Sequence, residues 1–294
     1  MTPRTVRFFS DGTELVGDLF VPDEPASSGR RPGIVLCHGY TGTRRIHLDD
    51  IAIALARCGF VTLTFDYSGW GDSAGPRGRL DPFTRVANAR ASLTFLSLQQ
   101  EVDPARLGVF GTSYGGAVAI WTAALDERVR CIVVSVAVGH GRRWMRSVRR
   151  PDEFEDLLER SSADRAARVM TGQSQSVPRD LVLLPDRESK RIGDAARQGN
   201  PMAVTEVPLS FVDDTLSFHP EWVVDRIAPR PILIINSDAD RLVPPEESLA
   251  LYAAAGEPKR LVTLKGFGHY EVYGGEALRQ TVEAAHSWYG AHLG

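Results

Sequence analysis

Residues 106–116 read RLGVFGTSYGG, an apolar strand candidate that runs directly into the pentapeptide GTSYG at 111–115 and then into an Ala-rich helix candidate. A side chain on so tight a strand-to-helix turn adopts a strained backbone conformation, and the flanking glycines avoid collisions that a Cβ would cause. The hydroxyl of Ser113 would then project above a sheet, beside a helix N-terminus whose N–H groups stabilise a developing negative charge. The pattern predicts a nucleophilic serine at position 113.

Short apolar segments alternate with helical patterns along most of the chain. Segments rich in Val, Ile and Leu are typical of strands buried on both faces of a parallel sheet, and they occupy residues 33–39, 60–66, 106–113, 129–138, 231–238 and 260–267. Helix candidates lie at 47–58, 82–99, 114–125, 245–255 and 275–289. Residues 4–10 and 14–21 are expected to form an antiparallel hairpin at the sheet edge. The alternation predicts an α/β fold with a mostly parallel central sheet flanked by helices.

Residues 139–221 interrupt this alternation, with a high density of charge and no clear buried strand. Apolar residues recur there at the spacing of amphipathic helices, which predicts a helical lid inserted after the sixth strand. The core would then comprise residues 1–138 and 222–294. Ordinary helix packing is the favoured interpretation of Trp144, Met145, Phe154 and Met170 and of Tyr67, Trp70 and Tyr270. The alternative is that they line a pocket beneath this lid, the last three from the core side.

Composition and charge exclude several classes of protein. The chain has 294 residues, 43% of them hydrophobic, which argues against disorder, and its net charge of −3 argues against a nucleic-acid partner. No apolar run reaches the ~20 residues of a membrane span and no N-terminal signal is visible, so we expect a cytoplasmic protein without a membrane partner. Cys37, Cys58 and Cys131 show no CxxC spacing, which makes a disulfide framework or a zinc site unexpected.

A nucleophilic serine needs a base, and the base needs an orienting carboxylate. Among seven histidines, His269 follows the last apolar strand in a glycine-bracketed loop, whereas His286 and His292 lie in the terminal helix candidate. Asp238 and Asp240 both follow the strand candidate at 231–238, and both remain candidates for the acid. The chain order is therefore Ser, Asp, His.

The sequence HGYTG at 38–42 ends the first parallel strand candidate. A second backbone N–H is needed there beside that of Tyr114 to bind an oxyanion, and Tyr40 is the expected donor. We expect His38 to brace this loop, with a catalytic role as the alternative.

Together these segments resemble the α/β-hydrolase superfamily over residues 4–138 and 222–291. In this resemblance Asp240 is the acid of the triad, because the superfamily pattern D-x-x-V-P matches at that position. Residues 66–75 are similar to the D-x-R-G-x-G-x-S-x-G loop of cocaine-esterase, X-prolyl-peptidase and dienelactone-hydrolase-like groups, with Ser68 in place of Arg and Asp72 as a carboxylate that braces the loop. Serine at position 113 argues against the dehalogenases and epoxide hydrolases of this fold, which use Asp.

The residues predict a serine hydrolase that cleaves a small to medium carboxylic ester, lactone or thioester. A peptidase or amidase and a C–C bond hydrolase share the same machinery, and a ligand-binding protein without catalysis is the alternative from another class. No metal or cofactor is expected, because no metal-ligand spacing and no G-x-G-x-x-G pattern occurs. The expected partner is a small-molecule substrate, and a homodimer is possible through the lid or an edge strand.

Arginine is concentrated in the expected lid. Residues 141–200 hold 12 arginines against 10 acidic residues. The exception to this near balance is a cluster at the start of the lid that we expect either to be solvated or to favour a carboxylate-bearing substrate; it consists of Arg142, Arg143, Arg146, Arg149 and Arg150.

Overall fold

The structure, a computed structural model, describes residues 1–23, 29–198 and 203–294. Within them an eight-stranded sheet has the order β1-β2-β4-β3-β5-β6-β9-β10. The hairpin β1–β2 is antiparallel and β2 is antiparallel to β4, whereas all the other neighbours are parallel. The strands are β1 (Arg4–Ser10), β2 (Thr13–Phe20), β3 (Arg31–Cys37), β4 (Val61–Phe65), β5 (Val102–Thr112), β6 (Val129–Ser135), β9 (Ile232–Ser237) and β10 (Lys259–Leu264).

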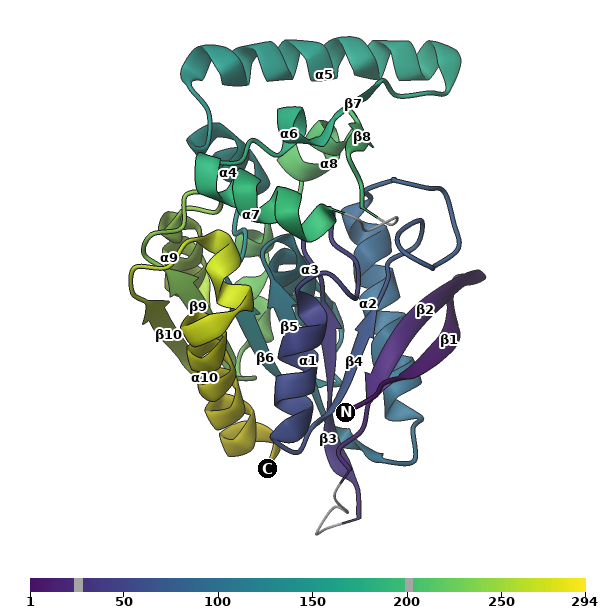
Figure 1. The fold of residues 1–294 in the computed structure, drawn as a ribbon, viewed down its shortest axis with the longest axis vertical. Coiled ribbons are helices and arrows are strands. Elements are labelled where there is room, and N and C mark those ends of the chain that lie inside the picture. The colour runs from purple at the N-terminus through teal and green to yellow at the C-terminus, as the bar shows by residue number, and fades with distance from the viewer. Residues whose placement is uncertain (24–28, 199–202) are drawn as a thin grey trace.

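Helices cover both faces of this sheet (Figure 1). One face packs against α1 (Leu48–Arg57) and α10 (Gly275–Leu293). The other face packs against α2 (Pro82–Ser97), α3 (Tyr114–Leu125) and α9 (Pro245–Ala254). The helices and the mostly parallel sheet confirm the α/β fold expected from the alternating pattern.

The described residues of 139–221 (139–198 and 203–221), here named the cap segment, lie beyond the carboxyl ends of the parallel strands (Figure 1). The cap segment follows β6, the sixth strand, and its long helix α5 lies outermost. It is not purely helical, because two three-residue strands pair antiparallel within it. Its elements are α4 (Gly141–Ser147), α5 (Pro151–Thr171), β7 (Ser176–Pro178), α6 (Arg179–Val182), α7 (Arg187–Arg197), β8 (Glu206–Pro208), α8 (Phe211–Leu216) and η1 (Pro220–Trp222).

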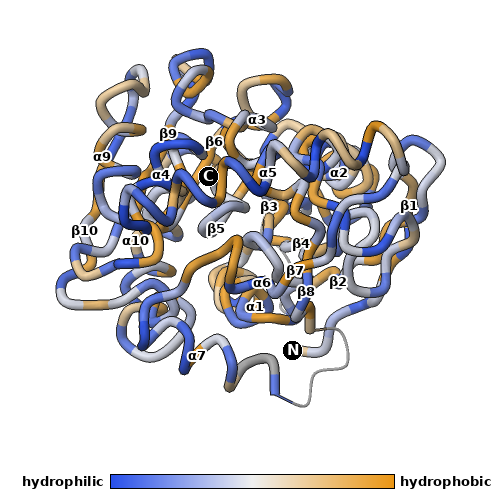
Figure 2. The backbone as a smooth tube through the Cα atoms, turned by 90° about the horizontal axis from the view of Figure 1, so that it is seen from above, coloured by the Kyte–Doolittle hydropathy of each residue, from blue (hydrophilic) through white to orange (hydrophobic). Residues whose placement is uncertain are grey.

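Figure 2 shows the hydrophobic colour concentrated on the central strands and the hydrophilic colour on peripheral turns, most clearly along α7. This distribution follows from burial, since strands such as β4 and β9 are buried along their whole length. No helix within residues 1–23, 29–198 and 203–294 has the length and apolarity to cross a membrane.

The predicted strands differ from the observed ones mainly at three ends, one of which is that of the strand predicted at 260–267, where β10 ends at Leu264. The strand predicted at 106–113 begins earlier, at Val102, because Val102 pairs with Arg31 of β3. The strand predicted at 129–138 ends at Ser135, because Val136 has a positive φ of 46° and turns the chain out of the sheet. The apolar run continues to Val138, which is buried off the sheet, so hydrophobicity alone does not mark where pairing ends.

The turn from β5 into α3 is packed so closely that glycine is required. A Cβ on Gly115 would lie 2.2 Å from the carbonyl oxygen of Cys37 and 2.5 Å from that of His38. A Cβ on Gly111 would lie 2.4 Å from the carbonyl oxygen of Gly115. These contacts bring the turn against the end of β3, and they explain the glycines that flank Ser113.

We predict that Gly115→Ala destabilises the protein by about 3 kcal/mol, because backbone oxygens cannot yield to the added methyl group. Gly290→Ala is the matched control, since Gly290 lies in α10 with no atom within 4 Å of its added Cβ. Alanine there is expected to stabilise the helix by roughly 0.5–1 kcal/mol. Chemical denaturation measures both values, and equal effects of the two substitutions would contradict the packing argument.

Candidate active site

The structure brings Ser113, His269 and Asp240 into one hydrogen-bonded row. Ser113 Oγ lies 3.1 Å from His269 Nε2, and His269 Nδ1 lies 2.6 Å from Asp240 Oδ2. Because a carboxylate only accepts, Nδ1–H donates to Asp240 and the unprotonated Nε2 faces the serine hydroxyl. All three residues are buried, with 8% or less of their surface exposed.

Each of the three side chains lies at the carboxyl end of a parallel strand. Ser113 follows β5 with φ 55° and ψ −127°, a strained conformation that lifts its side chain above the sheet. Asp240 follows β9, and His269 begins the short helix η3 (His269–Tyr273) after β10. The strands β5, β9 and β10 lie in one half of the sheet, in the order β5-β6-β9-β10, and they run parallel. Their carboxyl ends therefore lie at the same edge, where residues far apart in sequence meet.

The structure distinguishes the two aspartates that the residues alone left open. Asp240 Oδ1 accepts the backbone N–H groups of Leu242 (2.9 Å) and Val243 (2.8 Å), which leaves Oδ2 free to face His269. Asp238 instead accepts the N–H of Gly266 and pairs with Lys265 at the surface. The D-x-x-V-P pattern therefore has a physical basis: its third and fourth residues hold the carboxylate.

Tyr40 and Tyr114, predicted to donate backbone N–H groups, flank Ser113. Tyr114 is the first residue of α3, and Gly39 approaches the serine so closely that an added Cβ would lie 3.4 Å from Ser113 Cβ. Within the described part of the chain, neither the Tyr40 N–H nor the Tyr114 N–H donates a hydrogen bond. The two tyrosine rings pack edge to face at 5.0 Å, which holds the loop that carries Tyr40 against the start of α3.

Arg85 of α2 is a site residue that sequence reasoning missed. Its guanidinium is 2% exposed and donates to the carbonyl oxygens of Tyr40 (2.9 Å) and Gly39 (3.4 Å). It lies over the rings of Tyr67 and Trp70 at 4.6 and 4.9 Å, and none of the described carboxylates pairs with it. A lone arginine in a helix pattern carries no signal in the sequence, because its partners are backbone atoms and rings from other segments.

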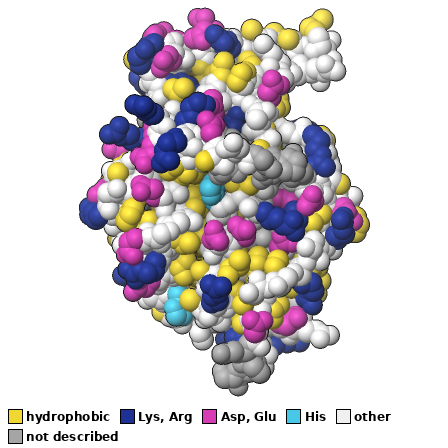
Figure 3. All heavy atoms as spheres, in the orientation of Figure 1, with side chains coloured by type: hydrophobic (Ala, Val, Ile, Leu, Met, Phe, Trp, Pro, Cys, Tyr) yellow, Lys and Arg dark blue, Asp and Glu magenta, His cyan; other side chains and the backbone are white. Residues whose placement is uncertain are grey.

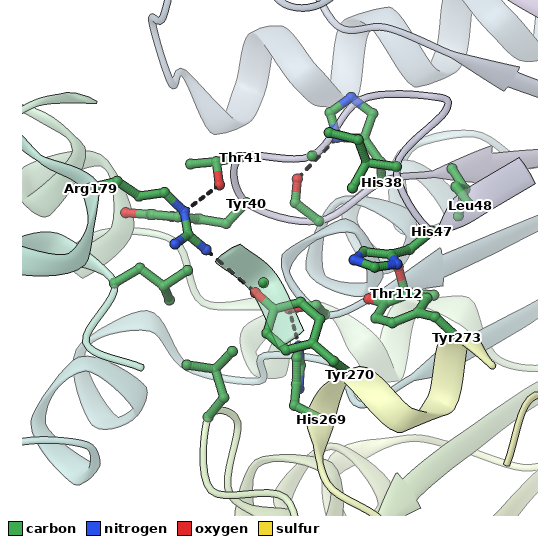
Figure 4. A pocket seen from close by; sticks show the side chains of 17 residues that line it. His38, Tyr40, Thr41, His47, Leu48, Thr112, Arg179, His269, Tyr270 and Tyr273 are labelled. Carbon is green, nitrogen blue, oxygen red and sulfur yellow. Dashed lines mark hydrogen bonds between the residues drawn. The ribbon is translucent and has the colours of Figure 1, made fainter. Parts of the chain in front are cut away.

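A pocket of about 60 Å³ opens onto Ser113 and His269 (Figure 4). It lies between the loop at 38–42, α6 of the cap segment and η3. Of the seven residues that the sequence offered as candidates for the pocket lining, only Tyr270 borders this pocket. Trp144, Met145 and Phe154 pack into the hydrophobic core, and Met170 is 84% exposed on α5. Described residues that line the pocket are His38, Gly39, Tyr40, Thr41, Gly42, Ile46, His47, Leu48, Thr112, Ser113, Arg179, Leu183, Gly193, Leu242, His269, Tyr270 and Tyr273.

Tyr67 and Trp70, the other two aromatic residues considered for the core side of the pocket, are buried in the core. Asp72 in the same loop braces it as expected, because its Oδ2 accepts from Arg44 Nη2 at 2.7 Å. Arg44 also pairs with Asp66, the first residue of this loop, and with Asp18 of β2, which ties the loop to β2.

The arginine cluster at 142–150 does not point into the pocket, which corrects the expectation of a substrate-binding role. Arg143 pairs with Glu247 and Glu221, both at 2.7 Å. Arg149 donates to backbone carbonyl oxygens within the cap segment, and Arg150 pairs with acidic residues at the start of α5. Figure 3 shows positive and negative side chains interspersed over one face of the molecule rather than gathered in patches.

The fold and this site define the protein as an α/β hydrolase, an enzyme of the hydrolase class. It belongs to the family described as serine aminopeptidase, S33, whose model matches residues 29–273. That description differs from the cocaine-esterase, X-prolyl-peptidase and dienelactone-hydrolase-like groups suggested by residues 66–75.

Three similar proteins illustrate the membership. An uncharacterized 31.7 kDa protein of Escherichia coli is 32% identical over 270 residues, covering 92% of this chain and 94% of its own. A thiohydrolase of Eupenicillium brefeldianum is 27% identical, with 90% of this chain and 86% of its own covered. The crystal structure of a hypothetical protein from Pseudomonas aeruginosa superposes with a TM-score of 0.86 at 26% identity, covering 99% of this chain and 93% of that one.

His38 is buried neutral beside the site, and this predicts how stability depends on pH. Burial and then the nearby Arg85 lower the pKa of His38 from 6.5 to about 3. The unfolded chain therefore takes up a proton in acid that the folded protein excludes, so stability is lost as pH falls through 6.5 toward 3. At pH 5 this one group costs roughly 2 kcal/mol relative to pH 8.

Chemical denaturation of the wild type and His38→Asn at pH 8 and pH 5 measures this effect. The variant is expected to lose about 2 kcal/mol less than the wild type between the two pH values. The same loss in both proteins would show that His38 does not carry the dependence.

Proposed function

We propose that this α/β hydrolase cleaves small to medium carboxylic esters through an acyl-enzyme formed on Ser113. The observation that carries the proposal is the buried row from Ser113 Oγ through His269 to Asp240, at the floor of a pocket. A hydroxyl, an imidazole with a fixed tautomer and a held carboxylate are the groups that nucleophilic acyl transfer requires.

In the first half of the reaction, His269 Nε2 takes the proton from Ser113 Oγ as the oxygen attacks the ester carbonyl. Asp240 accepts from Nδ1–H throughout, which keeps the imidazole in place and stabilises it when it becomes positively charged. His269 then gives the proton to the leaving alcohol. In the second half, His269 takes a proton from a water molecule as the water attacks the acyl group. The acid is released, and His269 returns the proton to Ser113 Oγ.

The negative charge on the carbonyl oxygen is bound by the N–H groups of Tyr40 and Tyr114 in this mechanism. In a trans peptide the N–H points away from the preceding C=O. The oxygen of Gly39 accepts from His38 Nδ1 (3.0 Å), Arg85 Nη1 (3.4 Å) and the N–H of Gly42 (3.4 Å), which turns the Tyr40 N–H to the opposite side. Arg85 is therefore a positioning residue for the oxyanion hole.

The cap segment acts as a lid in this proposal. A volume of about 60 Å³ holds roughly two water molecules, so an ester enters only when the cap segment moves away from the core. Hydrogen bonds that link the two parts include Trp144 Nε1 to the Leu242 carbonyl at 2.7 Å and Arg179 Nε to Thr41 Oγ1 at 2.7 Å. Polar links of this kind exchange with water at modest cost.

A thioester is the second candidate substrate, because a thiohydrolase is among the similar proteins and thioesters react through the same steps.

The pocket favours esters and thioesters over aminopeptidase substrates. A substrate ammonium group needs a carboxylate partner, and the pocket-lining residues in the described ranges include neither Asp nor Glu. The acidic run at 152–156 pairs instead with neighbouring arginines on α5.

Ser113→Ala is expected to lower the hydrolysis of umbelliferyl esters by at least about a thousandfold, because the nucleophile is lost. The fold should remain intact by circular dichroism. Labelling with a fluorophosphonate probe should occur on the wild type and not on this variant.

Ser135→Ala is the matched control, since Ser135 is a buried serine on the adjacent strand β6 whose hydroxyl has no described partner. This variant should keep both labelling and turnover. Near-normal turnover in Ser113→Ala would overturn the mechanism, and an unlabelled but folded wild type would support a binding protein without catalysis.

Arg85→Met is expected to lower kcat by about 10- to 100-fold with KM within about threefold, because an oxyanion donor acts on the transition state rather than on bound substrate. Arg85→Lys should recover part of the loss. Arg230→Met is the matched control, because Arg230 also donates to backbone carbonyl oxygens, those of Asp126, Val129 and Ile227.

Steady-state kinetics and denaturation of the three variants separate a role in positioning the oxyanion donors from a role in stabilising the fold. Arg230→Met should reduce stability without a selective loss of kcat. If Arg85→Met and Arg230→Met changed kcat to the same extent, Arg85 would have only a structural role.

A further inference from the structure

Arg179 is a buried cation in the wall of the pocket. Among the pocket-lining residues that the structure describes, it is the one with a permanent charge. Its side chain is 5% exposed, and it comes from α6 of the cap segment. A buried charge is costly unless it is paired, so its presence beside a nucleophile needs an explanation.

Two contacts hold the guanidinium between Thr41 and Tyr270 (Figure 4). Nε donates to Thr41 Oγ1 at 2.7 Å, and Nη2 lies 3.4 Å from the hydroxyl of Tyr270. Thr41 follows the proposed oxyanion donor Tyr40, and Tyr270 follows the proposed base His269. The positive charge is thus fixed between the two loops that carry the chemistry.

Only some of the N–H groups of the Arg179 guanidinium have a hydrogen-bond acceptor among the described residues. Nη1 donates to Asp180 Oδ1 at 2.9 Å, while the other oxygen of Asp180 binds Lys190 at 2.6 Å, and Lys190 also pairs with Asp194 at 3.4 Å. Arginine has five N–H groups. Three are accounted for by Thr41, Asp180 and Tyr270, which leaves one N–H on each Nη without a hydrogen bond to any described residue.

We propose that Arg179, with the hydroxyls of Thr41 and Tyr270, binds a carboxylate of the substrate, so that the preferred esters carry a free carboxylate near the scissile bond. This inference rests on the proposed ester hydrolysis and names its substrate class. A guanidinium offers two parallel N–H donors to a carboxylate, a geometry that also orients the substrate. Ser113 and Arg179 line the same pocket, so a carboxylate bound by Arg179 lies in the pocket that also receives the scissile carbonyl.

The proposal also explains what the pocket rejects. A neutral group at this position would leave the buried donors of Arg179 unpaired, and sites built to bind a polar group discriminate strongly against analogues that lack it. In this proposal the carboxylate-binding role that was considered for the cluster at 142–150 belongs to Arg179, another arginine of the cap segment.

The test compares two esters that differ in charge and little in shape: umbelliferyl esters of glutaric acid, with a free carboxylate, and of glutaramic acid, with a carboxamide. The wild type is expected to show at least about tenfold higher kcat/KM for the carboxylate. In Arg179→Met this ratio should fall to about one. Arg179→Lys should give an intermediate ratio, because lysine keeps the charge without the paired donors.

A second pair of esters places the charge on the alcohol side: the acetates of 3-hydroxybenzoate and 3-hydroxybenzamide. A charge preference that depends on Arg179 in either pair supports the proposal and shows which side of the ester the residue binds. Arg150→Met is the matched control, because Arg150 is a cap-segment arginine that pairs with Asp152 and Glu153 at the start of α5 and does not line the pocket. It should leave the preference unchanged.

Binding is measured separately, by calorimetry of free glutarate with Ser113→Ala and with Ser113→Ala/Arg179→Met. Arg179-dependent binding without hydrolysis of any ester would support the carboxylate site and overturn the proposed function. Hydrolysis that depends on Ser113 but shows no charge preference in either pair, together with no glutarate binding, would overturn the carboxylate site and leave the proposed function standing.

Discussion

The close packing of one turn against one strand end determines where every other part of the site lies. The turn after β5 holds Ser113 at a positive φ, and this strain persists because the surrounding backbone allows no alternative. Gly115 lies directly against the carbonyl groups that end β3. The loop that leaves β3 is consequently fixed beside the serine, with Gly39 in close approach to Ser113.

Buried arginines occur both around the site and away from it, and the difference between them lies in their partners. Arg44 is neutralised by three carboxylates, Asp18, Asp66 and Asp72, and it joins loops. Arg85 has rings and carbonyl oxygens for partners, and Arg179 shares a single carboxylate with a lysine. Arg85 pairs with none of the described carboxylates, and Arg179 has N–H groups without a hydrogen bond to any described residue; incomplete pairing of buried polar groups is expected at functional sites.

The sequence allowed prediction of those features that local patterns encode. The strand-to-helix turn at 111–115, the parallel strands and the approach of His269 to Ser113 follow from hydrophobic runs and loop positions. The choice of Asp240 over Asp238 required the superfamily pattern, and its cause, two backbone N–H groups, is visible only in three dimensions. The pocket lining could not be predicted from the sequence, because amphipathic spacing shows which side chains are apolar and not what they cover. Met170 is exposed for this reason.

The central claim is that Ser113 carries the acyl group during turnover, and trapping that intermediate tests it most directly. The protein would be mixed rapidly with umbelliferyl acetate, quenched in acid, digested and examined by mass spectrometry. We expect one acetyl group on Ser113, formed together with the first release of umbelliferone. Turnover accompanied by acetylation elsewhere, or by no acylated peptide at any quench time, would contradict the mechanism.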